Sequence, residues 1–191
     1  MTASLSVTIS YLALDARPER VFPPLPQGVR LDRVDRPSVR FYRYLYDAVG
    51  HEWLWWERRA KTDAELAAII HDPAVEIRVL MAGGEPKGYC EIDWRTPAEP
   101  DLALFGLMPE TTGLGLGPAM MGCVQDLVWS TPQTRRLTLN TCTLDHPNAL
   151  GFYQAMGFRV LRSEEKVIED PRLRPGWQDG PGALKDVSQP A

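Results

Sequence analysis

The first predicted element is a strand, because apolar and small polar side chains alternate at every second position over residues 4–14. Four prolines then interrupt the chain before a second, short strand, which is expected at 29–34. Over 38–49 the period changes, and apolar residues recur every three to four positions, as in a helix with one buried face. Gly50 is expected to end this helix.

The middle of the chain predicts one more helix and then a run of strands. Thr62 and Glu65 have the spacing of a capping box, and the helix that they open should stop before Pro73. The connections that follow are too short for crossover helices, so an antiparallel meander is expected. Its three strands are predicted at 75–82, 88–95 and 101–108.

The last third of the chain alternates helices with strands. The spacing of apolar residues predicts a helix over 118–129, a strand over 136–143, a helix over 147–156 and a strand over 157–167. From Asp170 onward, proline and glycine are frequent, which indicates an irregular tail.

Composition places the chain among ordinary globular proteins, with 191 residues, 44% of them hydrophobic and 24% charged. We expect a single domain over 1–169 and a tail over 170–191. No apolar run approaches the roughly 18 to 20 residues that cross a bilayer, and no basic residue precedes Arg17, so a membrane span, a signal peptide and membrane association are not expected and the location should be cytoplasmic. The net charge of −4 argues against a nucleic-acid partner, which needs clustered lysine and arginine.

Cysteine and histidine give no sign of a metal site. Cys90, Cys123 and Cys142 lie in apolar stretches without C-x-x-C spacing, so reduced and buried thiols are expected. His51 and His71 have no partners at the spacing of metal ligands, and no metal is expected.

The most informative stretch joins a strand to a helix through a glycine-spaced loop. Gly113, Gly115 and Gly117 precede Pro118, which is well suited to the first position of a helix. Without side chains at alternate positions, backbone N–H groups can converge on an anion at the positive end of the helix dipole. The spacing fits neither a dinucleotide fingerprint nor a triphosphate loop, which requires a lysine. A flexible turn without a ligand and a pyrophosphate cradle remain as alternatives.

The cradle is favoured by a resemblance to the GNAT superfamily of N-acetyltransferases. The signature Arg/Gln-x-x-Gly-x-Gly/Ala of that family aligns with Thr112, Gly115 and Gly117, with Thr112 in place of the Arg or Gln. Residues 145–158 resemble the family's Asn-x-x-Ala-x-x-x-Tyr-x-x-x-Gly-Phe segment, with His146 in place of the Asn.

The resemblance implies an α+β fold with a mixed, mostly antiparallel sheet of six to seven strands and about four flanking helices. The sheet of the family is splayed between its fourth and fifth strands, whose counterparts here are 101–108 and 136–143. The cofactor implied is acetyl-CoA, with its pantetheine arm between these strands and the backbone N–H near Leu107 polarising the thioester. The cofactor contacts implied are Leu107, Met108, Thr112, Gly113, Leu114, Gly115, Leu116, Gly117, His146 and Tyr153.

Candidate catalytic residues follow from the same resemblance and from the strand pattern. Tyr153 matches the tyrosine that protonates the leaving thiolate, although its place on an apolar helix stripe also fits a core aromatic. Glu91, on one face of the strand 88–95, is the candidate general base, with a solvated strand face as the alternative. Asp145 is expected to cap the following helix, and His146 is a second candidate base or cofactor contact.

The aromatic segment from Tyr42 to Trp56, which precedes the meander in the sequence, is the candidate acceptor wall. Such a segment can hold an amine by cation–π contact, and it fits a homodimer interface equally well. The candidate substrate contacts are Tyr42, Tyr46, Trp53 and Phe105.

The activity that the resemblance implies is direct transfer of an acetyl group to a primary amine of a small molecule or peptide. The sequence does not rank the acceptors. The alternative is a non-catalytic acyl-CoA-binding sensor or interaction module, which the departures from the motif at Thr112 and His146 favour.

Overall fold

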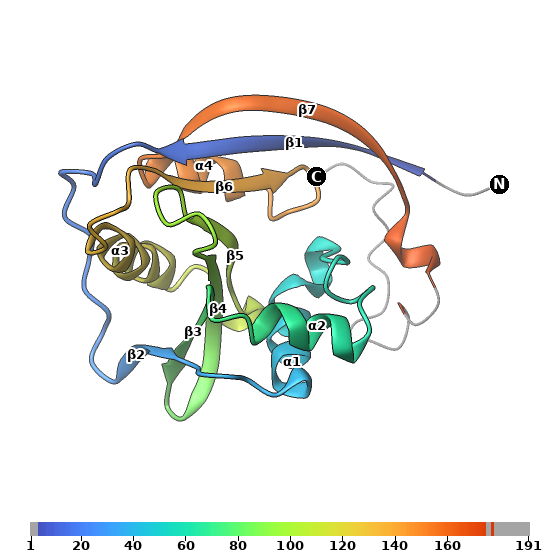
Figure 1. Cartoon of the computed structure of the whole chain (residues 1–191), viewed down its shortest axis with the longest axis horizontal. Coiled ribbons are helices and arrows are strands. Elements are labelled where there is room, and N and C mark those ends of the chain that lie inside the picture. Colours follow the sequence, from blue (N-terminus) through green and yellow to red (C-terminus); the bar gives the residue numbers. More distant parts are fainter. Residues whose placement is uncertain (1–3, 175–176, 178–191) are drawn as a thin grey trace.

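An open sheet of seven strands crosses the computed structural model, which describes residues 4–174 and residue 177. The strand order is β2-β3-β4-β5-β6-β1-β7 (Figure 1). All neighbouring strands are antiparallel except β5 and β6, which are parallel, so the predicted mixed α+β fold is confirmed. The strands are β1 (Ser4–Leu14), β2 (Val29–Arg33), β3 (Val75–Ala82), β4 (Glu85–Asp93), β5 (Asp101–Leu107), β6 (Leu137–Cys142) and β7 (Arg159–Glu169).

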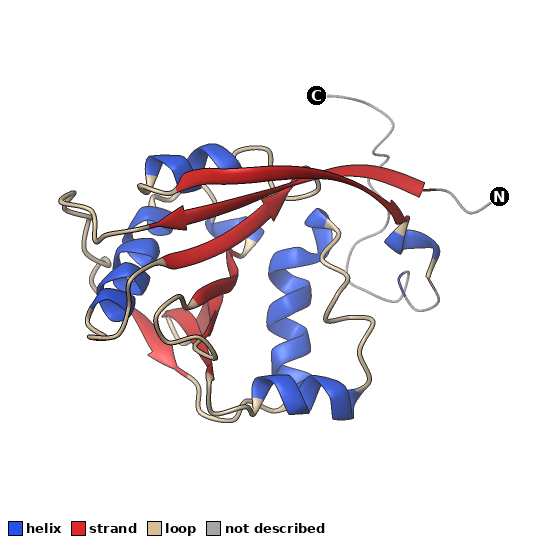
Figure 2. Cartoon of the chain, turned by 45° about the horizontal axis from the view of Figure 1, so that its top comes forward, coloured by secondary structure: helices blue, strands red, loops and turns tan. Residues whose placement is uncertain are grey.

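Four α-helices in the described part of the chain cover the two faces of this sheet (Figure 2). Helices α1 and α2 pack over Tyr89 and Ile77, whereas α3 and α4 pack over the opposite face, which carries Cys90 and Ile92. Alternation along β4 therefore divides the protein into two cores. The helices are α1 (Val39–Gly50), α2 (Asp63–Ile70), α3 (Leu116–Trp129) and α4 (Ala149–Ala155).

Local sequence signals explain where most of these helices begin. The Ser38 side chain accepts a hydrogen bond from the N–H of Phe41 at the start of α1, and the predicted capping box of Thr62 and Glu65 is present in α2. Helix α3 begins two residues earlier than predicted, with Gly115 as its N-cap, so Pro118 is its third residue and not its first. The missing N–H of proline still costs no hydrogen bond there, because the first four N–H groups of a helix have no partner within it.

Helix α1 lies unusually close to strand β5. A Cβ atom added at Gly106 would lie 2.3 Å from Cγ1 of Val49, so only glycine allows this approach. A Cβ atom at Gly50 would likewise meet the Trp55 ring at 2.4 Å. These two glycines bring the aromatic segment after α1 against the sheet.

Strands β5 and β6 are paired at one end only. Their single register pair joins Asp101 to Thr138, where the Thr138 hydroxyl donates to Oδ1 of Asp101 at 2.7 Å. Beyond this point the two strands have no further register pair, which confirms the opening that the family resemblance implies. Burial raises the pKa of the Asp101 carboxyl at the closed end of the opening.

The first strand of the sequence, β1, lies among strands from the last third of the chain. β1 pairs with β6 on one side and with β7 on the other, so segments from both ends of the described chain arch over the same region (Figure 1). A short 3-10 helix, Pro171–Leu173, follows β7, and its N-terminus is capped by the buried Asp170. The predicted irregular tail therefore begins with an ordered turn, while most of it lies outside the described residues.

None of the helices in the described ranges 4–174 and 177 has the length and apolar character that a membrane span requires.

Candidate active site

The opening between β5 and β6 leads into a cavity of about 870 Å³. On the α3/α4 side its lining includes the glycine loop and Tyr153, and on the α1 side it includes the aromatic segment after that helix. The face of β1 and β7 that carries Val7 and Lys166 completes the lining. Elements from the whole chain thus converge on one space.

The glycine loop leaves its backbone accessible. Gly113 and Gly115 have φ angles of +83° and +76°, and a Cβ atom at either position would meet nothing within 4 Å. Within the described chain, the N–H groups of these two glycines have no backbone acceptor, and Gly115 is the N-cap of α3. Unbonded donors at the positive end of a helix dipole form a site for an anion such as a phosphate.

The other cofactor contacts that the sequence predicts differ in their placement. Thr112 and Gly117 line the cavity, as does Leu107. Leu114 is 68% exposed and Leu116 packs into the core, so their side chains lie away from it.

Met108 is an exception among these predicted contacts. Its N–H donates to the carbonyl of Lys87 and its carbonyl accepts from Thr111, while its side chain is buried in the α1/α2 core. The predicted cofactor contact at Met108 is therefore wrong, because its backbone N–H and carbonyl are already hydrogen-bonded within the chain.

Tyr153 lies at the junction of the cavity and the α3/α4 core. It is 9% exposed and lines the cavity among Phe105, Phe152 and Phe158, whose ring centroids are 6.4, 5.5 and 6.1 Å from its own. Burial, and secondarily the negative charge of Asp145, raises the pKa of the phenol above its ordinary value. The phenol therefore keeps its proton at neutral pH and can donate it or a hydrogen bond.

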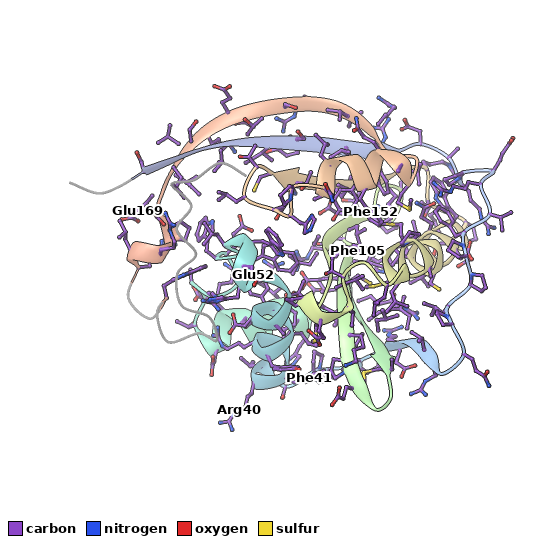
Figure 3. All side chains as sticks on the ribbon, turned by 180° about the vertical axis from the view of Figure 1, so that it is seen from behind. Arg40, Phe41, Glu52, Phe105, Phe152 and Glu169 are labelled. Atoms are coloured by element: carbon purple, nitrogen blue, oxygen red, sulfur yellow. The ribbon has the colours of Figure 1, made fainter. Side chains whose placement is uncertain are left out.

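Phe105 also lies on this side of the sheet. Its ring stacks on that of Phe152 at 5.8 Å, and the two side chains lie together in Figure 3. It lines the cavity from β5, next to the Phe152 ring, which itself lies beside Gly117 of the glycine loop.

Glu91 is not at the cavity, which corrects its predicted assignment as general base. The side chain is 1% exposed, and it lies on the α1 face of β4. Nη2 of Arg58 donates to its carboxylate at 2.6 Å, and the hydroxyl of Tyr42 donates to the other oxygen. A carboxylate held by two donors and removed from solvent is an anchor for the chain after α1.

Tyr42 belongs to the same buried group and is not a substrate contact. It is fully buried between Tyr46 and Tyr89, and it does not line the cavity. Burial, followed by the charge of Glu91, raises the pKa of its hydroxyl. The prediction that Tyr42 contacts substrate failed because this residue lies on the side of helix α1 that packs into the α1/α2 core.

Asp145 does not cap α4, contrary to the prediction. The N-cap of that helix is Asn148, without a side-chain hydrogen bond. Instead, Asp145 accepts from the Thr141 hydroxyl at 2.6 Å, from the N–H of Cys142 at 2.9 Å and from Nε1 of Trp55 at 3.1 Å. It therefore fixes the aromatic segment to the end of β6, a contact that local sequence cannot reveal.

His146 lines the cavity beside this anchor. Nδ1 of its ring accepts a hydrogen bond from the N–H of Asn148 at 3.0 Å. Because a backbone N–H can only donate, the neutral ring carries its proton on Nε2. Nε2 is therefore the hydrogen-bond donor of the neutral ring, whose centroid lies 4.8 Å from that of the Trp53 ring.

The aromatic segment forms a wall of the cavity. Tyr46 and Trp53, both predicted substrate contacts, line it together with Trp55 and Trp56. The ring of Trp55 packs at 5.4 Å from that of Tyr46. We call residues 53–56 the aromatic wall.

Some lining residues were missed by sequence reasoning. Strands β1 and β7 contribute Val7, Ile9, Lys166 and Ile168 to the lining. The two residues of β7 are more than 90 positions away from the aromatic wall along the chain. The only sequence signal is their alternation, which predicts a shared strand face but not what that face covers.

The structure also shows how the three cysteines are buried and whether possible metal ligands cluster. Cys90, Cys123 and Cys142 are free, but only Cys90 is fully buried, and burial raises its pKa to about 12. Among residues 4–174 and 177, no group of three or more His, Cys, Asp or Glu side chains is arranged to hold a metal ion.

Comparison with known families agrees with this geometry. Residues 38–158 match the family described as "Acetyltransferase (GNAT) family". The chain belongs to the GNAT acetyltransferase family. Proteins of this family are acyltransferases that use acyl-CoA cosubstrates.

Solved structures with the same fold are distant in sequence. A GCN5-related N-acetyltransferase from Sphaerobacter thermophilus has a TM-score of 0.62 at 15% identity, over 84% of this chain and 50% of its own. A tandem GNAT protein from the clavulanic acid biosynthesis pathway has a TM-score of 0.60 at 15% identity, over 85% of this chain and 52% of its own. An aminoglycoside acetyltransferase from an uncultured soil sample, solved with sisomicin, has a TM-score of 0.55 at 8% identity, over 68% of this chain and 87% of its own.

The chain spans only part of several GNAT-fold proteins, about half of the first two named above. No curated protein matches the sequence. At these identities the likeness shows the fold alone, and the acceptor does not follow from it.

Proposed function

We propose that the protein is an N-acetyltransferase that moves an acetyl group from acetyl-CoA to a primary amine by direct attack. The observation that carries this proposal is that one cavity joins the accessible amides of the glycine loop, the Tyr153 phenol and the aromatic wall. These are the anion site, proton donor and acceptor surface that such a transfer requires.

The residues present fit coenzyme A. Open space at Gly113 and Gly115, together with their unbonded N–H groups, supplies a cradle for the diphosphate. The opening between β5 and β6 admits an extended arm along Leu107, which lines it. Acetyl-CoA supplies the activated thioester carbonyl, and the chain holds and orients it.

The transfer also involves two protons: one stabilises the leaving sulfur, and the other has to leave the attacking amine. Tyr153 keeps its phenolic proton at neutral pH and holds it beside the cavity, where it can stabilise the leaving sulfur. A lysine-like amine has a pKa near 10, so only about one molecule in a thousand is unprotonated at pH 7, and its proton has to be removed.

We propose that the amine loses its proton to bulk water in the part of the cavity that Glu57 lines. Two carboxylates line the cavity, and one of them, Asp145, already accepts three hydrogen bonds. Glu57 is exposed and has no ion pair within the described chain. Its charge favours the ammonium form on entry, and bulk water is within reach to take the proton.

The test measures free-thiol release from acetyl-CoA with a panel of amines and calorimetric binding of coenzyme A. We expect Tyr153→Phe to lower kcat by about 100-fold, within the usual range for a general acid, with the Kd of coenzyme A changed less than twofold. Tyr11→Phe is the matched control, since that hydroxyl lies on β1 and bonds to Glu164 outside the cavity. Full turnover by Tyr153→Phe would remove the acid role, and failure of the native protein to bind coenzyme A would remove the whole proposal.

The second candidate is a non-catalytic acyl-CoA-binding module. The sequestration of Glu91 favours it, because no carboxylate of β4 is available in the cavity as a base. Thioester hydrolysis that no amine accelerates, together with normal coenzyme A binding, would favour this candidate over the transferase.

A further inference from the structure

The residues that line the α1-side half of the cavity indicate which kind of acceptor fits there. Its lining comprises Val7, Ile9, Tyr46, Val49, Trp53, Leu54, Trp55, Trp56, Glu57, Asn140, Cys142, Lys166 and Ile168. We call this set the acceptor half. From its composition we infer that the acceptor is a monoamine with an apolar or aromatic body and not a polycation, an inference that rests on the proposed acetyl transfer.

Two apolar surfaces face this space from separate parts of the fold. One is the aromatic wall, and the other is the face of β1 and β7 that presents Val7, Ile9 and Ile168. Figure 3 shows β1 and β7 arching past the segment that carries Glu52 toward Glu169. A ligand between these surfaces is removed from water on two sides, which stabilises an apolar body in proportion to the apolar surface that it buries.

The acceptor half carries one charged group of each sign, and the carboxylate of Asp145 lies next to it, bonded to Trp55 and Cys142. Glu57 is its carboxylate, and Lys166 is its ammonium, which pairs with Glu164 at 3.4 Å. A ligand with one ammonium finds one free carboxylate. A polyamine or aminoglycoside brings several ammoniums, and the other carboxylate that lines the cavity, Asp145, already accepts three hydrogen bonds.

Other charges around the aromatic wall add to this selection. The guanidinium of Arg174 lies 4.2 Å from the centroid of the Trp56 ring, and that of Arg59 lies 4.5 Å from the Trp177 ring. Each of these cations has a carboxylate partner: Arg174 pairs with Glu169, Arg59 with Asp47, and Arg58, which lies just after the wall, with the buried Glu91. These carboxylates are already neutralised, so a polycation at the wall would have to compete with the arginines for them.

The aromatic wall is held in place before any ligand arrives. Nε1 of Trp55 is bonded to Asp145, Trp56 lies under Arg174, and Trp53 packs on His146. A preformed aromatic surface loses little conformational freedom on binding, so it favours a flat or apolar ligand over a flexible, strongly hydrated one. Cation–π contact with the single ammonium adds to the same preference.

The experiment compares kcat/KM for phenethylamine and tryptamine with that for ethylamine, spermidine and kanamycin, with free-thiol release as the readout. We expect the aromatic monoamines to exceed spermidine and kanamycin by at least tenfold. Trp53→Ala should lower kcat/KM for phenethylamine at least tenfold more than for ethylamine, and Trp53→Phe should restore most of the loss. Tyr44→Ala is the control, because Tyr44 is an exposed aromatic of α1 outside the cavity.

Two outcomes would overturn the inference. One is a preference for spermidine or kanamycin, and the other is an equal effect of Trp53→Ala on phenethylamine and ethylamine. If acetyl-CoA binds but no amine releases thiol, the proposed transferase activity fails separately. Calorimetric titration of the same amines into the protein saturated with coenzyme A then decides the inference: tighter binding of phenethylamine supports it, and tighter binding of spermidine overturns it.

Discussion

The cradle at the start of α3 predicts a difference between two glycine-to-alanine variants. Gly113 in the loop and Gly84 in the β3–β4 turn have φ angles of +83° and +85°, and a Cβ atom at either position meets nothing within 4 Å. Alanine is thus equally strained at both positions, at about 1 to 2 kcal/mol before the entropic gain in the unfolded chain reduces it. We expect both variants to lose about 1 kcal/mol of unfolding free energy, which lowers Tm by about 2–4 °C.

Only Gly113→Ala should weaken the binding of coenzyme A. The added methyl group occupies the space in front of the loop amides, and loss of a hydrogen bond to a charged phosphate costs about 1.5 to 3 kcal/mol. At 1.4 kcal/mol per factor of ten, Kd should rise by about 10- to 100-fold.

Isothermal calorimetry and thermal unfolding measure both quantities on the same samples. If Gly113→Ala binds coenzyme A within twofold of the native protein, the diphosphate does not lie at this loop. If Gly84→Ala loses affinity to the same extent, the effect arises from general destabilisation and the cradle argument is equally wrong.

Three further changes probe how the site is supported. Glu91→Gln leaves Arg58 without its buried partner and should cost about 3 kcal/mol in urea unfolding; retention of full stability would show that the ion pair is dispensable. Gly106→Ala should cost about 1 to 3 kcal/mol by overpacking, and adding Val49→Ala should recover part of it, whereas additive losses would place the strain elsewhere. Burial raises the pKa of Asp101, so from its unfolded value of 3.8 up to the raised folded value the native state binds more protons, and the free energy of unfolding falls as pH rises. Asp101→Asn should flatten that part of the stability curve, and a slope as steep as in the native protein would assign it to another group.

Local signals made the secondary structure predictable. The capping box of Thr62 and Glu65 is confirmed, because a cap involves side chains and amides only a few residues apart. The turn between β3 and β4 at Gly83 and Gly84 has two positive φ angles, which glycine adopts without strain. Boundaries shifted where a backbone conformation had no distinct side-chain signal, as at the start of α3.

Predictions about single polar residues were less successful. Strand alternation placed Glu91 on one face of β4, but it carried no information on whether that face was solvated or covered by α1. The capping prediction for Asp145 failed because Trp55, 90 positions away, and the end of β6 take its hydrogen bonds. Both residues were assigned from their neighbours in sequence, whereas their partners are neighbours in space.

The sequence by itself determined the order of helices and strands, the glycine loop before α3 and the place of Tyr153 on α4. These features depend on periodicity, caps and backbone freedom, all of which act over a few residues. Only the tertiary structure decided which aromatic residues line the cavity, that Glu91 is an anchor, and that β1 and β7 form the surface opposite the aromatic wall. Burial and charge at a site depend on which distant segments pack around it, and that choice minimises the free energy of the whole chain rather than of any local stretch.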